Sequence, residues 1–158
     1  MKKIAFLAAV ALAGIAITGS ATADDALTAT PGEVFYDEGS GVHRPGAAPV
    51  VVASVTLPAA GSYTIHADTD FEQMDRPAEA SRARCDIKLP NEPNPNAGMQ
   101  LANNVPGGWG ALSFGVAVTM TQPGLVQLRC YQEFDQGPTL WFTHGRIMVQ
   151  AVPKITRF

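Results

Sequence analysis

Acidic side chains gather in one stretch of the chain. Asp68, Asp70 and Glu72 stand at alternate positions, and Glu79 follows. Counted from Asp68, the four fall at positions 1, 3, 5 and 12, which are ligand positions of the EF-hand calcium loop. Gln73 occupies the position at which that loop needs glycine, and a predicted strand rather than a helix precedes it, which argues against an EF-hand. A looser calcium site is one interpretation of the stretch, and a solvated acidic loop is the other.

Histidine is the second residue type that could carry chemistry. His43, His66 and His144 lack the spacing of structural or catalytic zinc sites, so separate surface histidines are the simpler interpretation. The sequence has no nucleophile elbow and no phosphate-binding or dinucleotide-binding glycine pattern. Glu133 and Asp135 could form a glycosidase pair, but a chain this short has little room for a cleft. We therefore expect no enzyme, with a small secreted hydrolase as the minor alternative.

Aromatic side chains are the better indication of function. Trp109 lies in a Pro-Gly-Gly-Trp-Gly segment, where the neighbouring glycines have no side chains that could cover the ring. Exposed Trp and Tyr give binding surfaces a large contact area at low entropic cost. Trp109 is therefore predicted to contact a ligand, with a place in the core as the equal alternative. Trp141 and Phe142 are predicted to fill an open end of the fold.

The two cysteines indicate the elements that position these side chains. Cys85 shares the apolar face of its strand with Ala83 and Ile87, and Cys130 shares that of another strand with Leu128. Two inward-facing cysteines can meet inside a β-sandwich, so we predict one disulfide between its two sheets. Two buried free thiols are the alternative.

Strand signals recur along the chain at short spacing. The segments 114–120 and 124–131 alternate apolar and other residues around a Pro-Gly turn and are predicted to form a hairpin. The segments 50–57 and 62–67 are predicted to form a second hairpin. One bent strand or two short ones close the chain between Thr139 and Val152. Because no amphipathic helix is evident, the predicted fold is an all-β antiparallel sandwich or jelly roll.

The first 23 residues have the pattern of a cleavable signal peptide. A basic start at Lys2 and Lys3 precedes an apolar run and an Ala-Thr-Ala site that ends at Ala23. Removal of this leader leaves a single predicted domain, 24–158, with 9 basic and 14 acidic residues. That balance argues against nucleic acid as a partner, and the apolar run is too short for a retained membrane anchor.

The segments GSYTIHA, RCDIKL, GLVQLRC and RIMVQAV together are similar to small exported jelly-roll modules of bacterial surfaces and, more remotely, to C1q-like domains. The resemblance implies an extracellular β-domain that could assemble as a homo-oligomer, and it carries no functional residues across. We expect a secreted, non-catalytic module that binds a protein or a carbohydrate, in the medium or, in a source with an outer membrane, in the periplasm. The alternative is a self-associating structural subunit.

Overall fold

A computed structural model describes residues 29–43, 48–73, 82–90, 97–103, 109–133 and 139–156. The predicted signal peptide therefore lies outside the described residues. Within them no helix is long and apolar enough to cross a membrane. Eight strands form the described fold: β1 (Val34–His43), β2 (Val50–Leu57), β3 (Gly61–Gln73), β4 (Arg82–Lys88), β5 (Ala97–Asn103), β6 (Trp109–Met120), β7 (Gly124–Gln132) and β8 (Leu140–Val152).

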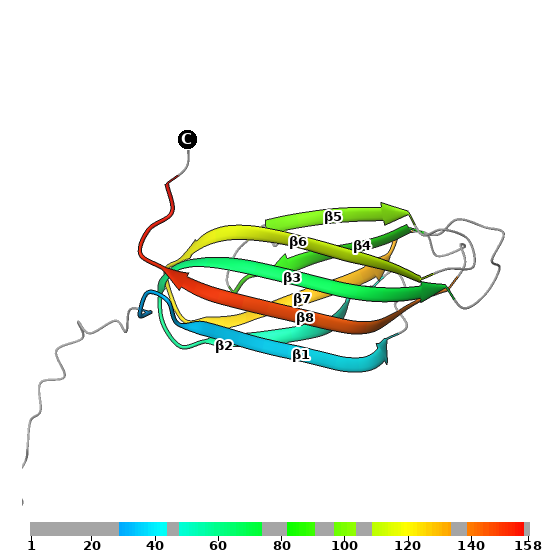
Figure 1. Cartoon of the computed structure of the whole chain (residues 1–158), viewed down its shortest axis with the longest axis horizontal. Coiled ribbons are helices and arrows are strands. Elements are labelled where there is room, and N and C mark those ends of the chain that lie inside the picture. The colour runs from blue at the N-terminus through cyan, green and yellow to red at the C-terminus, as the bar shows by residue number, and fades with distance from the viewer. Residues whose placement is uncertain are drawn as a thin grey trace, which may run out of the picture.

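The strands form two four-stranded antiparallel sheets that pack face to face (Figure 1). Sheet I has the order β1-β8-β3-β6, and sheet II has the order β2-β7-β4-β5. Pairing is nested, because the first strand pairs with the last, the second with the seventh, the third with the sixth and the fourth with the fifth. A long antiparallel pair rolled up in this way is a jelly roll, so the predicted fold class is confirmed.

The predicted hairpins are wrong, although their strands are present. β2 and β3 belong to different sheets, and so do β6 and β7. Each short turn instead carries the chain from one sheet to the other, and the two turns lie side by side. The register shows this, because Leu57 pairs with Gly124 before the turns and Gly61 pairs with Met120 after them, with no slip between.

Alternation of side chains builds the core between the sheets. Along β3 the inward residues are almost inaccessible to solvent, including Tyr63, Ile65 and Phe71. The Tyr63 hydroxyl donates a hydrogen bond of 2.8 Å to the Ala59 carbonyl, which satisfies the only polar group of this buried side chain. Burial of the ring raises the pKa of Tyr63.

The disulfide joins Cys85 and Cys130, as predicted, with a Cα–Cα distance of 4.1 Å. Its predicted position between the sheets is wrong. Cys85 lies on β4 and Cys130 on β7, which are neighbours in sheet II, and the two residues are direct partners in the register. Both side chains face the core, but a direct antiparallel pair brings them together across one ladder before either can reach the opposite sheet.

β1 and β2 close one side of the sandwich by a close backbone approach. A Cβ atom on Gly39 would lie 1.8 Å from the carbonyl oxygen of Val52, so only glycine fits at this position. Nearby, the Ser54 amide donates a hydrogen bond of 2.8 Å to the Asp37 carboxylate. These contacts tie the edge of sheet I to the edge of sheet II.

Candidate functional site

On the outer face of sheet II, several charged side chains pair with one another. Arg129 donates two hydrogen bonds of 2.8 Å to the Asp86 carboxylate, whose side chain is only 5% exposed. Two further contacts cross neighbouring strands: Arg82 with Glu133, and the Arg84 guanidinium over the Tyr131 ring. Such cross-strand pairs are typical of a solvated sheet face.

The outer face of sheet I is organised around β3. At its middle, Arg146 of β8 donates a hydrogen bond of 2.6 Å to Asp68, and this bond raises the pKa of Arg146. His144 Nε2 lies 2.8 Å from Glu38 Oε1 on β1, and Glu38 also accepts a hydrogen bond from Tyr36. The centre of this face is therefore also paired.

The predicted calcium ligands lie on a strand and not on a loop. Asp68, Asp70 and Glu72 are successive outward residues of β3, which sets their backbones about 6.7 Å apart. Asp68 is engaged by Arg146, and Glu79 lies outside the described residues. Among the residues that the structure describes, no group of three or more His, Cys, Asp or Glu could hold a metal ion. Because Glu79 is not described, the calcium site stays a prediction.

The histidines make separate contacts. His66 Nε2 lies 3.3 Å from the Ser113 hydroxyl on β6, one edge strand of sheet I, while His144 contacts Glu38 on β1, the other edge strand. The backbone of His43 pairs with that of Phe142, and the His43 side chain is not among those that the structure describes. The described contacts thus separate His66 from His144.

A row of two tryptophans and one carboxylate crosses three neighbouring strands at one end of sheet I. Glu72 on β3 pairs with Trp109 on β6 and with Trp141 on β8, and all three side chains face outward. Trp109 is 66% exposed, the highest value among the exposed large hydrophobic residues of the described chain. We call Trp109, Glu72 and Trp141 the tryptophan row. This exposure rules out the alternative that Trp109 lies in the core, and its contact with a ligand stays a prediction.

Trp141 and Phe142 were predicted to fill an open end of the fold; Phe142 is buried, but for Trp141 the prediction is wrong. The register of β3 with β8 shifts between Asp70 and Phe71, which marks a β-bulge near Thr143 of β8. Beyond the bulge the alternation changes phase, so Phe142 is fully buried and Trp141 faces outward. A strand without this bulge would have placed Trp141 inside.

The packing beneath Trp109 fixes its direction. Gly110 faces inward, and the Phe71 ring occupies the space above it, because a Cβ on Gly110 would lie 2.3 Å from that ring. Phe71 in turn packs on Phe142, with ring centroids 6.0 Å apart. Since Gly110 is held inward, its neighbour Trp109 must point outward.

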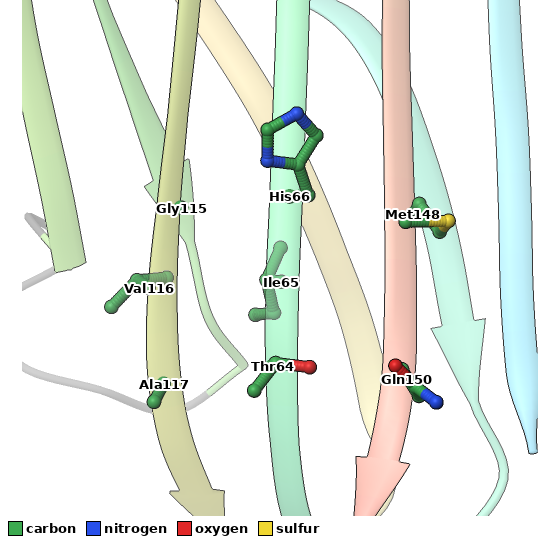
Figure 2. A pocket seen from close by; sticks show the side chains of 8 residues that line it. All are labelled: Thr64, Ile65, His66, Gly115, Val116, Ala117, Met148 and Gln150. Atoms are coloured by element: carbon green, nitrogen blue, oxygen red, sulfur yellow. The ribbon is translucent and has the colours of Figure 1, made fainter. Parts of the chain in front are cut away.

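A shallow depression of about 360 Å³ lies further along the same face (Figure 2). His66 and Thr64 of β3 stand beside Gly115 and Ala117 of β6, whose small size leaves the space open. Met148 of β8 borders it on the other side. Tyr36 pairs with Met148, and both are exposed, so an apolar patch adjoins the depression.

Comparison with protein-family models and with curated protein sequences finds no match. Solved structures share the fold. A chain of the T13 particle of infectious bursal disease virus has a TM-score of 0.53 and 13% identity, over 77% of this chain and 32% of the viral one. Eiger TNF from S. frugiperda has a TM-score of 0.50 and 10% identity, over 82% of this chain and 98% of its own. The globular domain of zebrafish complement 1qA has a TM-score of 0.45 and 11% identity, over 80% of this chain and 100% of its own. At such identities these proteins are similar to this chain in fold alone.

Proposed function

We propose that the protein is an exported, non-catalytic binding module whose ligand surface is the tryptophan row at one end of sheet I. The observation that carries the proposal is the placement of both tryptophans of the chain in one outward row. Tryptophan is enriched at binding sites, where its large ring supplies contact area.

The contrast between the two outer faces supports this assignment. The outer face of sheet II carries ion pairs that satisfy one another, as with Arg129 and Asp86. The end of sheet I instead presents aromatic rings beside carboxylates that lack such partners among the described residues. Exposed apolar surface that is not needed for packing marks an interaction site.

Export is the second part of the proposal. The leader pattern of residues 1–23 and the disulfide between Cys85 and Cys130 both support it, because disulfides persist in oxidising compartments. Mass spectrometry of the mature chain tests it, and a first residue of Asp24 is expected. A chain retained with residues 1–23 would contradict cleavage.

Substitution of Trp109 tests the binding surface. The immobilised protein is offered a panel of extracellular polysaccharides, oligosaccharides and basic or acidic peptides. Trp109→Ala should abolish a response that the wild type shows, with the melting temperature unchanged within about 2 °C, because the ring is 66% exposed. Leu125→Ala is the matched control, since Leu125 is an exposed apolar residue of sheet II. Equal loss in both variants, or loss only with Leu125→Ala, would contradict the proposal.

Self-association is the second candidate function, and the exposed apolar patch of sheet I favours it. Val34, Tyr36 and Met148 are 52%, 55% and 43% exposed on neighbouring strands. Contiguous apolar surface of this kind is typical of subunit contacts. Light scattering after size-exclusion chromatography should then give a mass that Tyr36→Ser lowers to that of one chain. A single-chain mass for the wild type at high concentration would exclude this function.

A further inference from the structure

From the tryptophan row we infer that the ligand group it receives is the guanidinium of an arginine side chain on a partner protein. The inference rests on the proposed function and specifies the chemistry of its ligand. It depends on the geometry of the row, on the charge around Glu72 and on the openness of the surface.

The geometry places one carboxylate between two indole rings. Glu72 is the direct partner of Trp109 on one side and of Trp141 on the other. In an antiparallel sheet a central residue forms a hydrogen-bonded pair with one neighbour and a non-hydrogen-bonded pair with the other, so the two tryptophan Cα atoms are about 10 Å apart. A flat group can therefore contact an indole face while its edge meets the Glu72 carboxylate.

The charge at this end of the sheet is only partly compensated within the described chain, where Asp70 acts electrostatically on Arg146. Glu38 and Asp68, on the same face, have His144 and Arg146 as partners. Neither the Glu72 nor the Asp70 carboxylate has a hydrogen-bond or ion-pair partner among the residues that the structure describes. Both carboxylates are partly exposed to solvent. A neutral ligand could donate hydrogen bonds to them but would bury their negative charge without neutralising it.

This combination selects an organic cation. Indole faces attract cations through their quadrupole, and tryptophan does so most strongly. A metal ion requires several oxygen ligands in close reach, whereas a single carboxylate, that of Glu72, lies between the two indole rings. A neutral sugar could stack on Trp109 and donate a hydroxyl hydrogen bond to Glu72, but only a cation would also neutralise the charge of that carboxylate.

Among organic cations, the guanidinium group fits best. It is planar, it stacks on aromatic faces and its fork of N–H donors matches a carboxylate. A lysine ammonium is a compact, strongly hydrated charge that offers no flat surface to the rings. The tryptophan row lies on an open strand face, so a small free cation would bury little area there. An arginine carried by a protein gains further contacts from its neighbours, and Arg and Trp are both enriched at the centres of protein interfaces.

The test uses tryptophan fluorescence, because Trp109 and Trp141 are the only tryptophans of the chain. The mature protein is titrated with acetyl-Gly-Arg-Gly-amide, and with the neutral isostere that carries citrulline in place of arginine. The arginine peptide should change the emission saturably, at about millimolar concentration, and bind about tenfold more tightly than the citrulline peptide. Raising NaCl from 0.05 to 0.5 M should weaken it several-fold.

Variants locate the contact. Glu72→Gln should weaken the arginine peptide about tenfold, and Trp109→Ala about three- to fivefold. Glu33→Gln is the matched control, because Glu33 is an exposed carboxylate at the opposite end of sheet I and its loss should change nothing. Circular dichroism of each variant verifies the fold.

Three results would overturn the inference. The first is equal affinity for the arginine and citrulline peptides, and the second is an unchanged affinity in Glu72→Gln. The third is a fluorescence response to choline or to maltotriose that exceeds the response to arginine and is lost with Trp109→Ala. This third result would leave the tryptophan row as the binding surface and change only its ligand. If no member of the binding panel depended on Trp109 either, the proposed function would fall as well.

Discussion

Removal of the disulfide should destabilise the fold without altering its topology. Cys85→Ala combined with Cys130→Ala eliminates a bond between two fully buried residues that are 45 positions apart in the sequence. The bond lies within sheet II, on a pair of strands that backbone hydrogen bonds already hold in register. Its effect therefore falls mainly on the unfolded chain, which loses a loop constraint.

The length of the loop that the disulfide closes sets how much stability the bond adds. In the chain-entropy model, closing a loop of 45 residues costs the unfolded state about 13 cal/mol/K, which is about 4 kcal/mol of native stability at 25 °C. The unfolded chain also becomes more expanded once the bond is removed, so the denaturant slope m should rise. The alanine variant additionally loses two buried sulfur atoms, and reduced wild-type protein separates that packing contribution from the loop effect.

Urea unfolding followed by circular dichroism measures both quantities. Oxidised wild type, wild type refolded under reducing conditions and the double variant are compared by linear extrapolation. We expect reduced wild type to lie about 4 kcal/mol below oxidised wild type with a larger m. A difference below about 1 kcal/mol with an unchanged m would refute the loop argument.

Three further predictions concern packing and charge. Arg129→Met should lower the free energy of unfolding by about 3 kcal/mol in urea titrations, because it leaves the Asp86 carboxylate, which is 5% exposed, without its counter-ion. Asp86→Asn should cost less, and equal losses in the two variants would contradict this prediction. Gly39→Ala should cost about 2 kcal/mol or more, because its Cβ would meet a carbonyl oxygen of β2 at 1.8 Å, whereas Gly115→Ala, whose nearest contact is 3.3 Å, should cost less. Stability should fall as the pH rises above 10, because the raised pKa of Tyr63 means that the folded state retains its proton beyond the point at which the unfolded chain loses it. In Tyr63→Phe, the urea midpoint should fall less between pH 8 and pH 11 than it does in the wild type. An equal fall in both proteins would show that another group causes the pH dependence.

The strands could be predicted because their alternation is local. The segment 50–57 coincides with β2, and the segment 124–131 lies within β7. Their pairing could not be predicted, because a turn such as Pro58–Ala60 looks the same whether it joins strands of one sheet or crosses between two. Only the nested long-range register decides between a hairpin and a jelly-roll crossing.

The acidic stretch shows where a signal was present but was outweighed. Thr69, Phe71 and Gln73 alternate with the carboxylates and are buried, so period two continues through the segment that we predicted as irregular. The abundance of Asp and Glu, which are depleted in strands, favoured a loop. Burial of Phe71 between the sheets outweighs that preference.

The tryptophan row as such was not predicted, because Glu72 was considered only as a calcium ligand and Trp141 only as a residue that fills an open end of the fold. Their position beside Trp109 depends on two registers and on a bulge near Thr143 that reverses the facing of β8. A bulge of one residue leaves no certain mark in the sequence.

The most direct test of the ligand surface is a nitrogen-15 NMR titration of the mature protein with acetyl-Gly-Arg-Gly-amide. The chain has two indole N–H signals, one from Trp109 and one from Trp141. We expect both to shift together with the Glu72 amide, while the Arg129 side-chain signal on sheet II stays in place. Shifts confined to sheet II, with both indole signals unmoved at saturation, would contradict the assignment of the tryptophan row as the binding surface.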